Sequence, residues 1–162
     1  VGFALMTSVG RFYMPDDTIL RELGRLQVLH SQMDHMMRLS IKRMLGISID
    51  DQGYWTETRG MTAALRDRAR ELISERYGDD DDTAGTLNKI LDDAEEVTGL
   101  RNRALHSVWI QEPGKSPVLH DRDNWLKTHV NYQLPTAAEL ADISARIARI
   151  QGALDSVTRQ TL

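Results

Sequence analysis

Apolar positions recur at alternating intervals of three and four residues in four long segments of the chain. This spacing is typical of one face of an α-helix. It predicts helices over residues 17–45, 58–77, 83–110 and 136–157. The last segment is the clearest, because Thr136 and Glu139 stand at the two positions of a helix capping box just before its apolar positions begin.

Residues 111–134 break the helical pattern. They contain two prolines and a glycine, and residues 129–134 partly alternate between apolar and polar side chains. This composition predicts a loop or a short β-ribbon. A connection of this length inside a compact domain more often serves a function than not.

Four helices that each carry one apolar face bury those faces best against one another. The sequence therefore predicts an all-α protein, an up-and-down bundle of four main helices with a loop or short β-ribbon inserted before the last helix. Residues 1–15 are expected to form an N-terminal extension, and residues 16–162 a single domain. A length of 162 residues agrees with one domain.

Composition narrows the choice of chemistry. The absence of cysteine excludes a disulfide framework, a thiol nucleophile and a cysteine zinc site. The same absence fits a reducing cytosol, so a cytoplasmic protein is expected. No apolar stretch approaches the ~18 residues of a membrane span, so no membrane partner is expected. The net charge is -4, yet residues 79–96 hold eight acids and one lysine, so the rest of the chain is net positive.

Several polar residues have competing interpretations. His30 and Asp34 lie one turn apart, as a metal site requires, but a hydrogen-bonded core histidine is the simpler interpretation, so no metal site is predicted. The four aspartates of residues 79–82 read as a solvated loop before a helix start. The outer face of the second helix is expected to carry Arg66, Arg68 and Arg70, and solvent-facing positions are expected for His120 and His129.

Arg101 interrupts the apolar face of the third predicted helix. A buried guanidinium is costly unless it is paired, so either the core opens onto a cleft at this position or an acid meets the side chain. Asn102 and His106 follow and share one helix face. Arginine grips phosphate oxygens and histidine titrates near neutral pH, so this group suits a phosphodiester.

The order Arg101-Asn102-x-x-x-His106 resembles the Arg-Asn-x-x-x-His motif of the HEPN superfamily of small helical proteins. Residues 23–26 and 30–34 are similar to the first helix of bacterial HEPN-like proteins, and the likeness extends over residues 17–162. Two positions depart from the pattern. Ser107 stands where glycine is common, and Asp34 stands where glutamate is common.

The resemblance implies a metal-independent endoribonuclease in which the ribose 2′-OH attacks the adjacent phosphate and leaves a 2′,3′-cyclic phosphate. His106 would be the general acid or base, Arg101 would stabilise the charge of the transition state, and Asn102 would position the imidazole or the phosphate. The family usually places this site between two subunits, so a homodimer is expected. A toxin or defence setting, with an antitoxin or nucleotidyltransferase partner, is a further implication.

An RNA substrate needs positive potential near the motif. Basic residues between positions 101 and 130 outnumber acidic ones, and Trp109, Trp125 and Tyr132 are aromatic candidates for stacking a base or for anchoring the insert. The candidate RNA-binding residues beside the motif are Arg103, Lys115, Arg122 and Lys127.

Other interpretations remain open. Arg101 could be the structural ion-pair partner of Asp34, and His106 could be a structural histidine. A non-catalytic HEPN-like module that binds a nucleotide or a protein is the alternative function, and a dimeric helical scaffold is the third.

Overall fold

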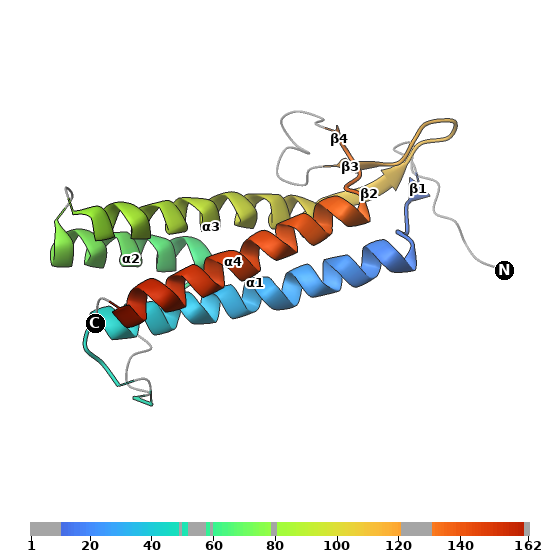
Figure 1. The fold of residues 1–162 in the computed structure, drawn as a ribbon. Coiled ribbons are helices and arrows are strands. Elements are labelled where there is room, and N and C mark those ends of the chain that lie inside the picture. Colours follow the sequence, from blue (N-terminus) through green and yellow to red (C-terminus); the bar gives the residue numbers. More distant parts are fainter. Residues whose placement is uncertain are drawn as a thin grey trace.

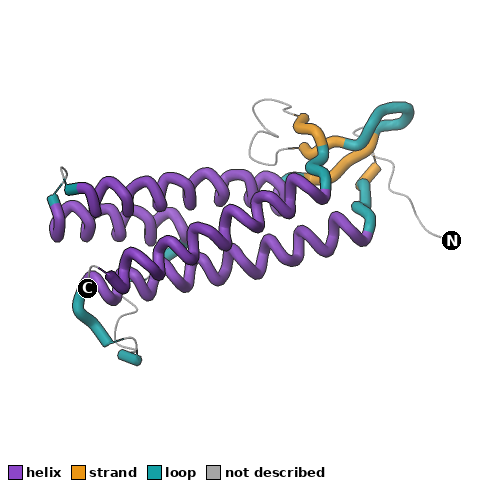
Figure 2. The backbone as a smooth tube through the Cα atoms, viewed as in Figure 1, coloured by secondary structure: helices purple, strands orange, loops and turns teal. Residues whose placement is uncertain are grey.

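The computed structural model describes residues 11–48, 50–51, 58, 60–78, 81–120 and 131–160. Within these residues four helices form a bundle. A small β-sheet lies at one end of it (Figures 1 and 2). The helices are α1 (Asp17–Met44), α2 (Thr62–Tyr77), α3 (Asp82–His106) and α4 (Ala137–Gln160). The strands are β1 (Arg11–Phe12), β2 (Val108–Gln111), β3 (Val118–His120) and β4 (Asn131–Gln133). The predicted all-α bundle with a β-insert before its last helix is confirmed.

Local capping chemistry sets the helix starts. The side chain of Asp16 accepts the backbone N–H groups of Thr18 and Ile19, and Asp81 does the same at the start of α3. At α4 the predicted capping box is confirmed: the backbone N–H of Thr136 donates to Glu139 at 2.7 Å, and that of Glu139 donates to Thr136 Oγ1 at 3.2 Å. These bonds satisfy donors that a helix start would otherwise leave unpaired.

The core consists of the apolar faces that the periodicity predicts. Leu26, Met33 and Ile41 of α1 are fully buried, as are Leu91 of α3 and Ile147 of α4. Partly buried apolar side chains pack against this core, and some of them lie at the start of the β-insert.

The helices do not simply alternate in direction. Asp34 of α1 lies beside Thr62 at the start of α2, and Met44 at the end of α1 lies beside Arg76 at the end of α2. These two helices are therefore parallel, which differs from the expected up-and-down order. The connection over residues 45–61 is long enough to return the chain. From α2 onward, each helix runs antiparallel to the one before it (Figure 1).

The shortness of α2 divides the bundle into two halves. α2 starts beside Asp34, so it covers only the C-terminal part of α1 and the N-terminal part of α3 (Figure 1). We call this part the covered half. The part of α1 before Asp34 and the part of α3 after Thr98 form the open half, where α2 is absent and the β-sheet begins.

The sheet is antiparallel with strand order β1-β2-β3-β4. Its first strand, β1, lies within the predicted N-terminal extension. Phe12 of this strand pairs with Ile110 of β2, which joins the extension to the sheet. The third helix is shorter than predicted. It ends at His106, and residues expected to be helical, 108–110, form β2 instead, because pairing with β3 satisfies their backbone groups. In the described part of the chain, no helix is both long and apolar enough to cross a bilayer.

Candidate active site

Arg101 lies on the core-facing side of α3, in line with the buried residues Ala94, Val97 and Ala104. Its side chain is nevertheless partly exposed. Arg101 lies in the open half, and α2 does not extend to this turn of α3 because it begins beside Asp34. Of the two alternatives that the sequence left, the structure shows the core opening at this position.

The three motif residues are in direct contact. Arg101 Nη1 donates to Asn102 Oδ1 at 2.7 Å and lies 3.0 Å from His106 Nε2. Asn102 and His106 are both exposed. They lie on the side of α3 that faces α2 in the earlier, N-terminal part of the helix. The predicted trio is therefore a contiguous cluster that solvent can reach.

The contact between Arg101 and His106 restricts which tautomer the imidazole can adopt. A guanidinium has donors and no acceptor, so a hydrogen bond between the two groups requires Nε2 of His106 as the acceptor and the ring proton on Nδ1. An imidazole in this state has the lone pair that a general base needs, and here the lone pair lies beside a fixed cation.

Gln27 of α1 completes the cluster. Its Oε1 accepts a hydrogen bond from Arg101 Nη2. This side chain was not predicted from the sequence, because a glutamine on the exposed side of an amphipathic helix has no distinguishing signal. Gln27 lies one turn before His30, on the adjacent face of α1. Only the packing of α1 against α3 shows that its side chain reaches Arg101.

The alternative ion pair between Arg101 and Asp34 is not formed. Asp34 Oδ2 instead accepts a hydrogen bond from Thr62 Oγ1 at 3.0 Å and lies 3.8 Å from His30 Nδ1. Burial lowers the pKa of Arg101, and the nearby charge of Asp34 opposes that shift. Asp34 thus acts on Arg101 through space, since its short side chain is held at the start of α2.

His30 is a core histidine, as predicted. It is 4% exposed, and its Nε2 lies 3.1 Å from Thr98 Oγ1 on α3. Burial lowers the pKa of His30 below its ordinary value of 6.5; Asp34 opposes this shift, whereas Arg101 and Arg66 add to it. Among the described residues, no three His, Asp or Glu side chains gather as a metal site requires.

Arg66 is a correction to the sequence prediction. It was expected on the outer face of α2, but it is 7% exposed and faces the α2–α3 contact, 3.9 Å from Glu95. Its long stem covers apolar surface between the helices while its head reaches toward an acid. Arg68 pairs with Glu71 of its own helix, as an outer-face residue can. Arg70 is a second correction, because it is half-buried and pairs with Asp92 and Glu95 of α3.

The four candidate RNA-binding residues do not form one surface with the trio. Arg103 is exposed on the side of α3 opposite Arg101, one turn before His106, and its Cζ lies 4.4 Å from the centroid of the Tyr132 ring. Lys115 is exposed and pairs with Glu112, which offsets its charge. Arg122 and Lys127 lie outside the described residues.

The other predicted side chains serve the insert. Trp109 donates from Nε1 to the carbonyl of Ala104 at 3.1 Å and stacks on Tyr13 with 6.4 Å between ring centroids. It therefore anchors β1 and β2. His120 is buried, contrary to the prediction, because Asn131 faces it across β3 and β4 and contacts its Nδ1 at 2.7 Å. Trp125 and His129 lie outside the described residues.

Comparison of the chain with protein-family models, with curated proteins and with solved structures finds no match.

Proposed function

We propose that the chain is a HEPN-like, metal-independent endoribonuclease whose catalytic residues are Arg101, Asn102 and His106. The observation that carries the proposal is the 3.0 Å contact between Arg101 Nη1 and His106 Nε2 on an exposed part of the bundle. It supplies a cation for phosphate and a neutral imidazole for proton transfer within one hydrogen bond of each other.

The proposed reaction starts when a phosphate takes the place of the neutral acceptors around Arg101. Bonds from a guanidinium to phosphate oxygens are stronger than bonds to an amide, so the phosphate competes with Asn102 and Gln27. Arg101 then turns its Nη1 from His106 to a phosphate oxygen, which frees Nε2 of the imidazole.

His106 accepts the proton of the ribose 2′-OH on Nε2 while the 2′-oxygen attacks phosphorus. The P–O5′ bond breaks, and the products are a 2′,3′-cyclic phosphate and a 5′-hydroxyl. Arg101 stabilises the negative charge on the phosphorane-like transition state. In a homodimer, which the family resemblance implies, the histidine of a second copy would donate the proton to the leaving 5′-oxygen.

A labelled single-stranded RNA incubated with the purified chain in the presence of a chelator tests the proposal. We expect cleavage that leaves cyclic phosphate and 5′-hydroxyl ends, and no cleavage at a position where a single 2′-deoxynucleotide is substituted. His106→Ala should reduce the rate ~10²–10⁴-fold, the usual contribution of a general acid or base. The matched control is His35→Ala, which removes an exposed histidine from α1 without touching the trio.

Cleavage at the deoxy position, or full activity of His106→Ala, would contradict the proposal. If the wild-type chain cuts no RNA, the alternative of a non-catalytic nucleotide- or protein-binding module takes its place. Sedimentation of the wild-type chain tests the dimer, and co-purification from a cytoplasmic extract tests the antitoxin or nucleotidyltransferase partner.

A further inference from the structure

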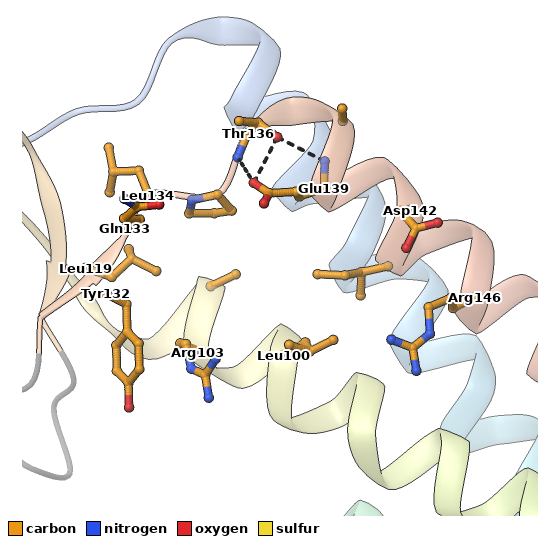
Figure 3. Close-up of a pocket in the computed structure, with 14 residues that line it drawn as sticks. Leu100, Arg103, Leu119, Tyr132, Gln133, Leu134, Thr136, Glu139, Asp142 and Arg146 are labelled. Carbon is orange, nitrogen blue, oxygen red and sulfur yellow. Dashed lines mark hydrogen bonds between the residues drawn. The ribbon is translucent and has the colours of Figure 1, made fainter.

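A hollow lies between α3, the start of α4 and the β-insert. It encloses about 750 Å³, within the usual ~300–1,000 Å³ of small-ligand pockets. Figure 3 shows it bounded by Leu100 and Arg103 on α3, by Leu119 and Tyr132 on the insert, and by the first turns of α4. Most of its wall is apolar, from Leu100, Ala104, Leu119, Leu134, Pro135 and Ile143.

A guanidinium lies over an aromatic ring at one end of this pocket. The Cζ atom of Arg103 lies 4.4 Å from the centroid of the Tyr132 ring. Arg103 takes part in no ion pair within the described residues, so a carboxylate does not draw its guanidinium away from the ring. Unpaired nucleic-acid bases stack on tyrosine rings and on arginine planes of this kind.

The charge of the pocket selects against a phosphate. Two cations, Arg103 and Arg146, and two acids, Glu139 and Asp142, line the pocket, so their charges balance. Arg146 is already engaged by Glu96 at 2.7 Å. Hydrogen bonds from Thr136 lower the pKa of Glu139, which keeps that carboxylate ionised. A neutral planar group therefore fits this pocket better than an anion does.

The pocket also lies close to the proposed phosphate site. Arg103 precedes His106 by three residues, and side chains at this spacing are neighbours on a helix surface, ~5–6 Å apart at Cβ. A strand whose phosphate contacts Arg101 and His106 can therefore turn a neighbouring base around α3 toward Tyr132. A base held in a duplex cannot enter, because it stays paired and stacked.

We propose that this pocket is a nucleobase subsite, which makes single-stranded RNA the substrate class of the neighbouring trio. The assignment rests on the proposed function for its substrate. Base capture itself can be measured without cleavage.

The test uses the full-length His106→Ala chain and fluorescence anisotropy with a labelled single-stranded RNA octamer and the matching duplex. We expect the single strand to bind more tightly. Adding Tyr132→Leu, which keeps apolar volume but removes the ring, should weaken single-strand binding about ten-fold or more. Tyr132→Phe should restore it. Phe12→Leu, which removes an exposed aromatic ring from β1 outside the pocket, is the matched control.

A second variant guards against loss of fold. Ala138→Leu adds volume at an exposed α4 position that lines the pocket and removes no contact, so it should block binding while thermal unfolding stays unchanged. Equal affinity for single strand and duplex, or unaltered binding by both Tyr132→Leu and Ala138→Leu, would overturn the subsite.

The two proposals fail separately. If the wild-type chain cleaves RNA through His106 but Tyr132→Leu leaves KM and the dissociation constant unchanged, only the subsite is wrong. If no RNA is cleaved but binding depends on Tyr132, only the catalytic proposal is wrong. If both hold, Tyr132→Leu raises KM for cleavage and leaves kcat nearly unchanged.

Discussion

Arginines in the two halves of the bundle have different partners. In the covered half, Arg70 donates to Asp92 at 2.8 Å and to Glu95 at 3.0 Å, and its pKa is raised, first by the bond to Asp92. In the open half, Arg101 contacts Gln27, Asn102 and His106 and forms no ion pair with any described residue. One guanidinium is therefore paired with carboxylates, whereas the other lies beside an amide and an imidazole.

This difference follows from the length of one helix. α2 supplies a fourth wall to the covered half, and acids on α3 pair with its arginines there. Where α2 is missing, α1 and α3 continue without it, and a core position of α3 is occupied by a polar side chain. The structure thus uses the same residue type as a link between helices in one half and as a candidate phosphate ligand in the other.

The largest expected effect concerns the packing of the covered half. Leu91 is 1% exposed and lines a small internal void together with Ala69 and Ile73 of α2. Leu91→Ala should lower the free energy of unfolding by ~2–5 kcal/mol, because it removes buried methyl groups and leaves a cavity. Leu20→Ala, at a position 41% exposed in the open half, should cost less than ~1 kcal/mol. Urea denaturation measures both, and equal losses would show that the halves do not differ in packing.

The second prediction compares the two arginines directly. Arg101→Ala should slow RNA cleavage by ~10²–10³-fold, the usual cost of removing a donor to transition-state charge. Arg70→Ala should leave the cleavage rate unchanged and lower the free energy of unfolding by no more than ~1 kcal/mol, since its pairs are exposed to solvent. Initial rates and thermal unfolding of both variants are the measurements. If Arg70→Ala lost activity to the same degree, the distinction between the halves would be wrong.

The bundle could be predicted because local patterns determine its helices. Apolar spacing located all four helices, and Thr136 and Glu139 marked the start of α4. Two features depend on distant contacts and could not be predicted. β2 forms at residues 108–110 because β3 pairs with it, although the helical periodicity continues through Val108. The parallel arrangement of α1 and α2 depends on the path of residues 45–61, and periodicity carries no information on direction.

The site was predicted in part for the same reason. Arg101, Asn102 and His106 lie on one helix, so their spacing alone placed them together. Gln27 comes from another helix, and its role depends on how α1 packs on α3. Arg66 has the composition of an outer-face residue, and only the tight α2–α3 packing buries it.

The third prediction concerns pH and the boundary between the halves, where His30 is buried. Its pKa in the folded chain lies below the ordinary value of 6.5, so the unfolded chain binds more protons below that pH. The free energy of unfolding should therefore fall as pH drops below about 6.5, with a contribution of up to ~1.4 kcal/mol per pH unit until the folded-state pKa is passed.

His30→Gln removes this titration and should flatten the dependence relative to wild type in urea denaturation between pH 5 and pH 7. A proton NMR titration of the His30 ring gives the folded-state pKa directly. A value at or above 6.5 would mean that the charge of Asp34 outweighs the effect of burial, and the predicted pH dependence would be wrong.

The smallest expected effect tests whether Gln27 holds Arg101 in place. Gln27→Leu removes the acceptor from α1 and leaves Arg101 with the partners on its own helix. A hydrogen bond of this kind contributes ~0.5–1.5 kcal/mol, so cleavage should slow several-fold, well short of the loss in Arg101→Ala.

Gln27→Glu keeps an acceptor but pairs Arg101 with a charge, as Arg70 is paired in the covered half. We expect it to fold normally and to bind RNA more weakly than Gln27→Leu, because a carboxylate competes with phosphate for the guanidinium. The measurement is the KM of each variant for RNA cleavage. If Gln27→Glu bound RNA as well as wild type does, the idea that neutral partners keep Arg101 available to a phosphate would be wrong.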